Sequence, residues 1–82
     1  MNKDFKYILF MECETESRRK TKVWVCLNRK AGTTLGRVYW QFGWRQYVFE
    51  PEAKRIFSAG CLRDIAKFLD DVRKERNNEE DK

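Results

Sequence analysis

The 82-residue sequence contains no histidine, so it lacks the usual general base, the usual activator of a nucleophile and the commonest metal ligand. Its carboxylates, among them Glu50, Glu52 and Asp64, are not accompanied by a nucleophile–base set or a ligand cluster. We therefore expect a binding protein with no cofactor and no metal, and we rank an enzyme below the binding alternatives.

Cysteines are few. Cys13, Cys26 and Cys61 are odd in number, widely separated and without CxxC spacing, so the sequence indicates neither a disulfide framework nor a zinc knuckle. We expect small buried hydrophobes or free thiols. Cys61 falls at the predicted start of a helix, where a thiol pKa can be lowered, but without a neighbouring base the buried thiol is the favoured interpretation.

Long apolar runs are also missing. The longest, Tyr7 to Met11, is far short of the ~20 residues of a membrane span, and the N-terminus lacks the apolar region of a signal peptide. The sequence predicts a cytosolic protein without membrane contact. At 41% hydrophobic and 15% aromatic residues it is not composed like a disordered chain. We expect one domain over residues 1–77 and a frayed charged tail over 78–82.

Acidic residues are absent from Ser17 through Phe49, where eight Lys and Arg residues and all three tryptophans lie. Residues 51–82 balance eight positive against eight negative charges, so the net charge of +5 comes from the first 50 residues. A basic segment rich in aromatic residues is typical of a surface that binds an anionic partner.

Four strands are expected. The first covers Phe5 to Cys13 and the second about Thr21 to Asn28, with Gly32 marking the turn that follows. The third and fourth lie within residues 35–51 and are joined near Phe42-Gly43, and Pro51 closes the fourth because it has no N–H to donate. An even-numbered loop places Val38 opposite Phe49 or Tyr47, and Trp40 opposite Tyr47 or Arg45, whereas an odd loop shifts the faces.

A helix follows from about Cys61 to Arg76, because Leu62, Ile65, Leu69 and Val72 repeat at helical spacing. Ser58 or Gly60 can start it. The predicted fold class is therefore α+β: a small four-stranded, mainly antiparallel sheet with one C-terminal helix packed on one face.

One helix covers only one face of such a sheet, so the other face is available for solvent or a partner. The alternation assigns seven residues to the helix side: Val23, Val25, Leu27, Val38, Trp40, Tyr47 and Phe49. It assigns six to the open face: Lys22, Trp24, Arg37, Tyr39, Gln41 and Gln46. Rings and guanidinium planes on an open sheet are the kind of platform on which unpaired bases stack.

The first functional hypothesis is a non-enzymatic module that binds an anionic, base-containing ligand, either single-stranded nucleic acid or a nucleotide. Phosphates would be neutralised by Lys20, Lys22, Arg29, Arg37 and Arg45. Bases would stack on Trp24, Tyr39 and Trp44, with Gln46 as a polar contact. The same aromatics also serve small cores, and the basic run at 18–20 follows three glutamates and also fits a solvated loop.

The second hypothesis is a protein-interaction module, since Trp, Tyr and Arg are the types enriched at interface hot spots. A homodimer joined through the open faces is one version of it.

Residues 33–72 carry LGRVYW, WRQYVFEP, IFSAGCL and DIAKFL, and with them the chain resembles a group of short uncharacterised bacteriophage and prophage proteins. The positions that carry the resemblance are Leu35, Gly36, Trp40, Trp44, Arg45, Gln46, Tyr47, Phe49, Pro51, Phe57, Gly60, Cys61 and Leu62. The resemblance implies an accessory protein acting in the host cytoplasm and supplies no activity to transfer. With it, an inhibitor of a host or anti-phage defence protein becomes another version of the second hypothesis. The resemblance also draws attention to Trp44-Arg45-Gln46-Tyr47, because turns favour Gly, Asn, Asp and Pro over such bulky residues.

Overall fold

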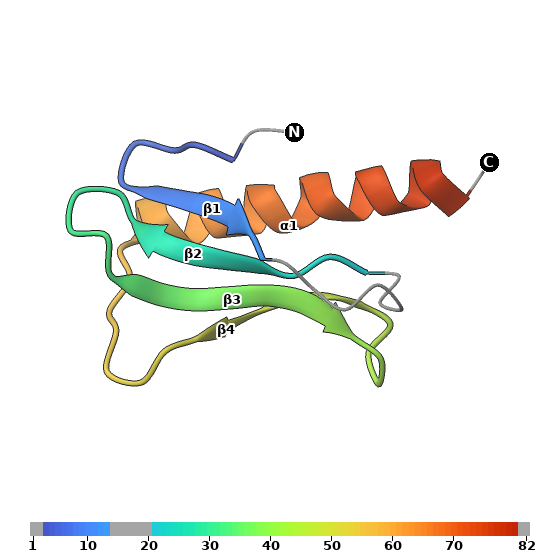
Figure 1. Ribbon diagram of the computed structural model, residues 1–82, viewed down its shortest axis with the longest axis horizontal. Coiled ribbons are helices and arrows are strands. Elements are labelled where there is room, and N and C mark those ends of the chain that lie inside the picture. The colour runs from blue at the N-terminus through green and yellow to red at the C-terminus, as the bar shows by residue number, and fades with distance from the viewer. Residues whose placement is uncertain (1–2, 14–20, 81–82) are drawn as a thin grey trace.

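The computed structural model of the chain describes residues 3–13 and 21–80, with side chains described as far as residue 76. Four strands form one antiparallel sheet in the order β1-β2-β3-β4, followed by a single helix (Figure 1). The strands are β1 (Ile8–Glu12), β2 (Trp24–Asn28), β3 (Thr34–Gln41) and β4 (Gln46–Pro51), and the helix is α1 (Ala59–Glu80). The predicted α+β class is confirmed.

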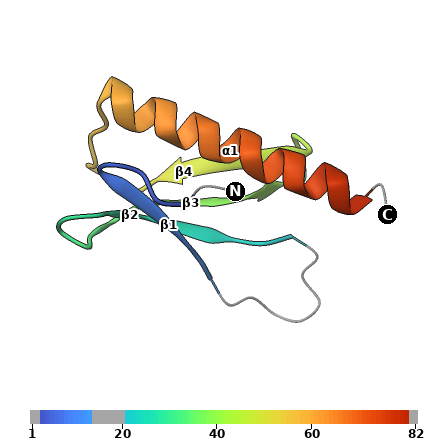
Figure 2. The same ribbon diagram turned by 90° about the horizontal axis from the view of Figure 1, so that it is seen from above.

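The helix crosses one face of the sheet and leaves the other uncovered (Figure 2). It begins where the sequence allows, because Ser58 Oγ accepts a hydrogen bond from the Cys61 backbone N–H at 3.2 Å and so caps the first turn. It continues to Glu80, four residues beyond the predicted end, and includes three of the five residues that the sequence assigns to a frayed tail.

Strand β1 is shorter than predicted because residues 3–5 fold back along it. Asp4 bridges Leu9 in antiparallel fashion, and the Phe10 backbone N–H donates to the Lys3 carbonyl at 2.9 Å. This segment covers part of the outer edge of the sheet, which would otherwise present unpaired backbone groups.

The β3–β4 hairpin has one of the two registers that the sequence allowed for an even-numbered loop. Its loop holds four residues, 42–45, so Val38 lies opposite Phe49 and Trp40 opposite Tyr47. Val38 is fully buried under α1, and its odd-numbered neighbours Arg37, Tyr39 and Gln41 therefore point to the open face, as expected.

The predicted faces of β2 are wrong. Trp24 and Cys26 lie under the helix, and Val23, Val25 and Leu27 lie on the open side, half-buried. Both sets contain large apolar residues, so alternation alone does not choose between them. The pairing of Trp24 with Val38 decides, because directly paired residues share a face and Val38 faces α1.

The core between sheet and helix is aromatic. The Phe68 ring stacks on Phe10 with 3.8 Å between centroids and meets Trp24 edge-on at 5.4 Å. Its buried members are Ile8, Phe10, Trp24, Cys26, Leu35, Val38, Ile65, Phe68 and Val72. A chain of this size relies on a few large side chains for its core, and these supply it.

Candidate functional site

The three predicted stacking residues do not lie on one surface of the structure. Trp24 is 2% exposed and its ring contacts Phe68 and Tyr47, so its assignment to the open face is wrong. Tyr39 does lie on the open face, half-buried. Trp44 is 69% exposed at the tip of the β3–β4 hairpin. Of the three, Trp44 alone presents most of its ring surface to solvent.

The predicted cations that the structure describes also lie at different places in the fold. Lys20, with the rest of the basic run at 18–20, lies outside the described residues. Lys22 Nζ lies between Glu12 at 3.7 Å and Glu75 of α1 at 3.8 Å, which places it on the helix side and not on the open face. Its predicted position there is wrong because it shares the face of Trp24.

Arg37 is on the open face, but its guanidinium already forms an ion pair with the Glu50 carboxylate. Its Nη2 donates to Glu50 Oε1 at 2.8 Å, and the Tyr39 hydroxyl donates to Glu50 Oε2 at 3.2 Å. These two hydrogen bonds, with that of Arg37 the stronger, hold the pKa of Glu50 below its usual value. A phosphate bound at Arg37 would have to compete with this carboxylate.

Arg29 contacts the segment that precedes β1. Its Nη1 lies 3.4 Å from Asp4 Oδ1 and donates to the Phe5 carbonyl at 3.2 Å. Arg29 lies at the opposite end of β3 from the hairpin tip, beside the β2–β3 turn (Figure 1). The four predicted cations that the structure describes, Lys22, Arg29, Arg37 and Arg45, therefore do not form one surface.

The hairpin tip is the part of the predicted site that the fold presents to solvent. Phe42 is 74% exposed, and with Trp44 it gives the four-residue loop two exposed aromatic side chains. Arg45 adopts φ 54°, a left-handed conformation that side chains other than glycine and asparagine adopt at some cost. Gln46, the predicted polar contact, is exposed next to it. No acidic residue occurs between Gln41 and Gln46.

Next to the tip, side chains of β3, β4 and α1 pack against one another. Trp40 and Tyr47 face each other across the hairpin with ring centroids 5.2 Å apart, and the Arg76 guanidinium of α1 lies 4.0 Å from the Trp40 ring centroid. Such a cation–π contact ties the helix to the hairpin. The exposed rings of the tip thus extend from a part of the hairpin that is packed against α1.

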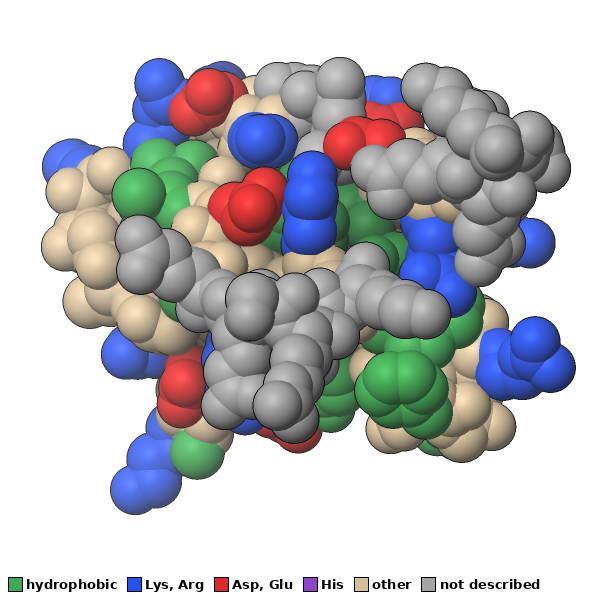
Figure 3. Space-filling view, turned by 45° about the vertical axis from the view of Figure 1, so that its right-hand side comes forward, with side chains coloured by type: hydrophobic (Ala, Val, Ile, Leu, Met, Phe, Trp, Pro, Cys, Tyr) green, Lys and Arg blue, Asp and Glu red, His purple; other side chains and the backbone are tan. Residues whose placement is uncertain are grey.

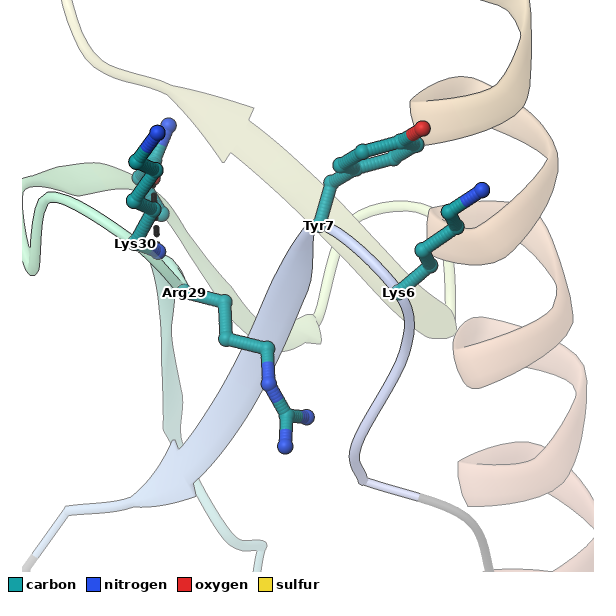
Figure 4. Close-up of a pocket in the computed structure, with 5 residues that line it drawn as sticks. Lys6, Tyr7, Arg29 and Lys30 are labelled. Carbon is teal, nitrogen blue, oxygen red and sulfur yellow. Dashed lines mark hydrogen bonds between the residues drawn. The ribbon is translucent and has the colours of Figure 1, made fainter.

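A second feature lies at the other end of the sheet. An open pocket of about 610 Å³ is lined by Lys6, Tyr7, Asn28, Arg29 and Lys30 (Figure 4). Sequence reasoning found Arg29 and missed Lys6 and Tyr7, because nothing in the sequence signals that residues 6–7 and 28–30 meet. Among the side chains that Figure 3 colours by type, Lys and Arg are scattered between acidic and hydrophobic ones.

The three cysteines are free thiols, and one of them is buried. Burial, with a smaller contribution from Cys61, raises the pKa of Cys26 to about 12, so its thiol stays protonated at neutral pH. Cys13 and Cys61 are half-buried free cysteines. Within residues 3–13 and 21–76, whose side chains the structure describes, no group of three or more Cys, Asp or Glu residues is arranged to hold a metal ion.

Comparison of the chain with protein-family models, with curated proteins and with solved structures finds no match. In the described part of the chain, no helix is both long and apolar enough to cross a membrane.

Proposed function

We propose that this protein is a small non-enzymatic binding module whose contact surface is the β3–β4 hairpin tip, and that its ligand is single-stranded nucleic acid or a nucleotide. The observation that carries the proposal is the exposure of Phe42 and Trp44, at 74% and 69%, beside Arg45 on one four-residue loop. A turn does not require these residue types, and exposed rings on a loop cost solubility without stabilising the fold.

Base stacking explains the aromatic pair. Stacking on an aromatic side chain is worth roughly 1–3 kcal/mol per base, so two rings supply about 2–6 kcal/mol. Arg45 adds a guanidinium that pairs with phosphate, and the net charge of +5 favours the approach of an anion. Stacking of this strength alone corresponds to dissociation constants from tens of millimolar to tens of micromolar, without sequence readout, and the Arg45 contact tightens them.

Tryptophan fluorescence tests the proposal directly. Because Trp24 is buried, a large part of any quenching by a bound base is expected to come from Trp44. We expect saturable quenching by a mixed single-stranded oligonucleotide or by common nucleotides, and weaker binding at higher salt. Trp44→Ala should weaken binding, measured by calorimetry, roughly 5- to 150-fold, the equivalent of one stacked base.

Arg45→Asn is the matching charge test. Asparagine tolerates the left-handed conformation at this position, so the variant removes the guanidinium and keeps the turn. Lys54 is the other described residue outside glycine with positive φ, at 64°, and Lys54→Asn removes the same charge elsewhere. If Arg45→Asn weakens binding and Lys54→Asn does not, the result supports the hairpin tip as the contact surface. Unchanged oligonucleotide and nucleotide binding by both Trp44→Ala and Arg45→Asn would contradict the proposal.

A protein partner is the second candidate, and the same exposure of Phe42 and Trp44 favours it, since a Trp–Arg pair is a common interface anchor. A phage-type inhibitor of a host or defence protein would use the tip in this way. Salt separates the two candidates: a partner held mainly by the rings would bind almost equally at low and high salt, whereas phosphate pairing weakens. The predicted homodimer relied on Trp24 and Tyr39 on the open face, and Trp24 does not lie there.

A further inference from the structure

The pocket at the β2–β3 turn is built from two segments that the backbone ties together. The Arg29 backbone N–H donates to the Tyr7 carbonyl at 2.9 Å, and the Arg29 guanidinium reaches across to the Phe5 carbonyl and Asp4. Asn28 Oδ1 accepts hydrogen bonds from the Lys30 and Ala31 backbone N–H groups at 3.0 and 2.9 Å, which fixes the turn. The side chains of Arg29 and Asn28 therefore already make hydrogen bonds within the walls of the pocket.

Two lysines of this pocket have no carboxylate partner within the described residues, whereas Lys22 and Lys67 do. They are Lys6, from the segment before β1, and Lys30, from the turn. Figure 4 shows both side chains extending to the same side in that view, with Tyr7 between them and Arg29 running the other way. The Tyr7 ring is 58% exposed, and Lys6 Nζ lies 5.2 Å from its centroid.

We propose that this pocket is an anion site for a ligand carrying a di- or triphosphate, separate from the hairpin tip. Lysine ammonium groups bind phosphate as point charges, and two of them on separate segments suit several linked phosphates better than a single one. The volume of about 610 Å³ falls within the range of small-molecule sites and exceeds the needs of one ion. Three lining cations against Asp4 leave a local charge of about +2.

Inorganic tripolyphosphate is the probe, because it has no base to stack on the tip. Titration of the ¹⁵N-labelled full chain should shift the backbone amides of residues 6–7 and 28–30 with one saturable curve. Lys6→Gln/Lys30→Gln should weaken binding about tenfold or more, since both ammonium contacts are lost. Lys54→Asn/Lys74→Gln removes the same two charges outside the pocket, and we expect less than about a threefold change.

Three outcomes would overturn the proposal: shifts centred on residues 41–46, equal weakening by the two double variants, and no saturation at millimolar probe. The expected result does not rest on the function of the tip, because Trp44→Ala should bind tripolyphosphate as the wild type does. A nucleoside triphosphate then distinguishes the source of the phosphate chain. Binding tighter than that of tripolyphosphate, lost in Tyr7→Leu, indicates a nucleotide stacked on Tyr7, and equal binding indicates recognition of the phosphate chain alone, so both results support the site.

Discussion

At the scale of single residues, Gly36 shows how closely β3 and β4 are packed. A Cβ atom built at this position lies 2.5 Å from the Glu50 carbonyl oxygen and 2.5 Å from Cζ of Phe49. Neither neighbour can move freely, since one is strand backbone and the other packs edge-on against Phe57. Glycine is needed here for space and not for an unusual φ.

We therefore expect Gly36→Ala to lower the free energy of unfolding by about 1–3 kcal/mol, the usual cost of overpacking. Urea denaturation followed by circular dichroism measures it. Gly43→Ala is the control, because its nearest neighbour is Gln41 Oε1 at 3.8 Å, and it should change stability by no more than about 0.5 kcal/mol. Equal stabilities for the two variants would show that the ring of Phe49 yields easily.

At the scale of elements, the sequence predicted the β3–β4 hairpin well and β2 poorly. The hairpin has a mainly polar set and an apolar set on alternating positions, so any even-numbered loop puts Val38 and Phe49 on the same face. In β2 both alternating sets contain large apolar residues, and the choice depends on long-range pairing with Val38. The pocket was missed for a related reason: Lys6 and Lys30 are 24 positions apart and read as ordinary exposed lysines.

The open face of the same hairpin makes a pH-dependent prediction. Hydrogen bonds from Arg37 and then Tyr39 lower the pKa of Glu50 below its ordinary 4.5. Because the folded pKa is below the unfolded one, this contribution to stability is fully present above about pH 4.5 and is lost as the pH falls through the folded pKa. An NMR titration of the Glu50 carboxyl carbon should give a midpoint below 4.5 in the wild type.

Arg37→Gln removes the stronger hydrogen bond and the nearby charge, so the Glu50 midpoint should rise toward its ordinary value. Tyr39→Phe should raise it less. Arg63→Gln, a matched loss of charge on the exposed face of α1, should leave it unchanged. A wild-type midpoint at or above 4.5 would mean that the Arg37–Glu50 contact does not persist in solution.

At the scale of the whole molecule, one aromatic core joins the sheet to the helix. Phe68 of α1 contacts Phe10 of β1 and Trp24 of β2, and Val38 of β3 lies in the same buried cluster. Most of the stability of a helix in a protein comes from the packing of its apolar face, so α1 depends on this core. We expect a single cooperative unfolding transition, in which the helical circular dichroism signal and the fluorescence of buried Trp24 change together.

Phe68→Ala should lower the free energy of unfolding by about 3–5 kcal/mol, because it removes a ring with contacts to two strands and leaves a cavity. Both signals should still shift together. Leu62→Ala, on the same helix but 52% exposed, is the control and should cost far less. If the helical signal of Phe68→Ala were lost at lower urea than the tryptophan signal, helix and sheet would not share one core, and the hairpin tip would not depend on α1 for its support.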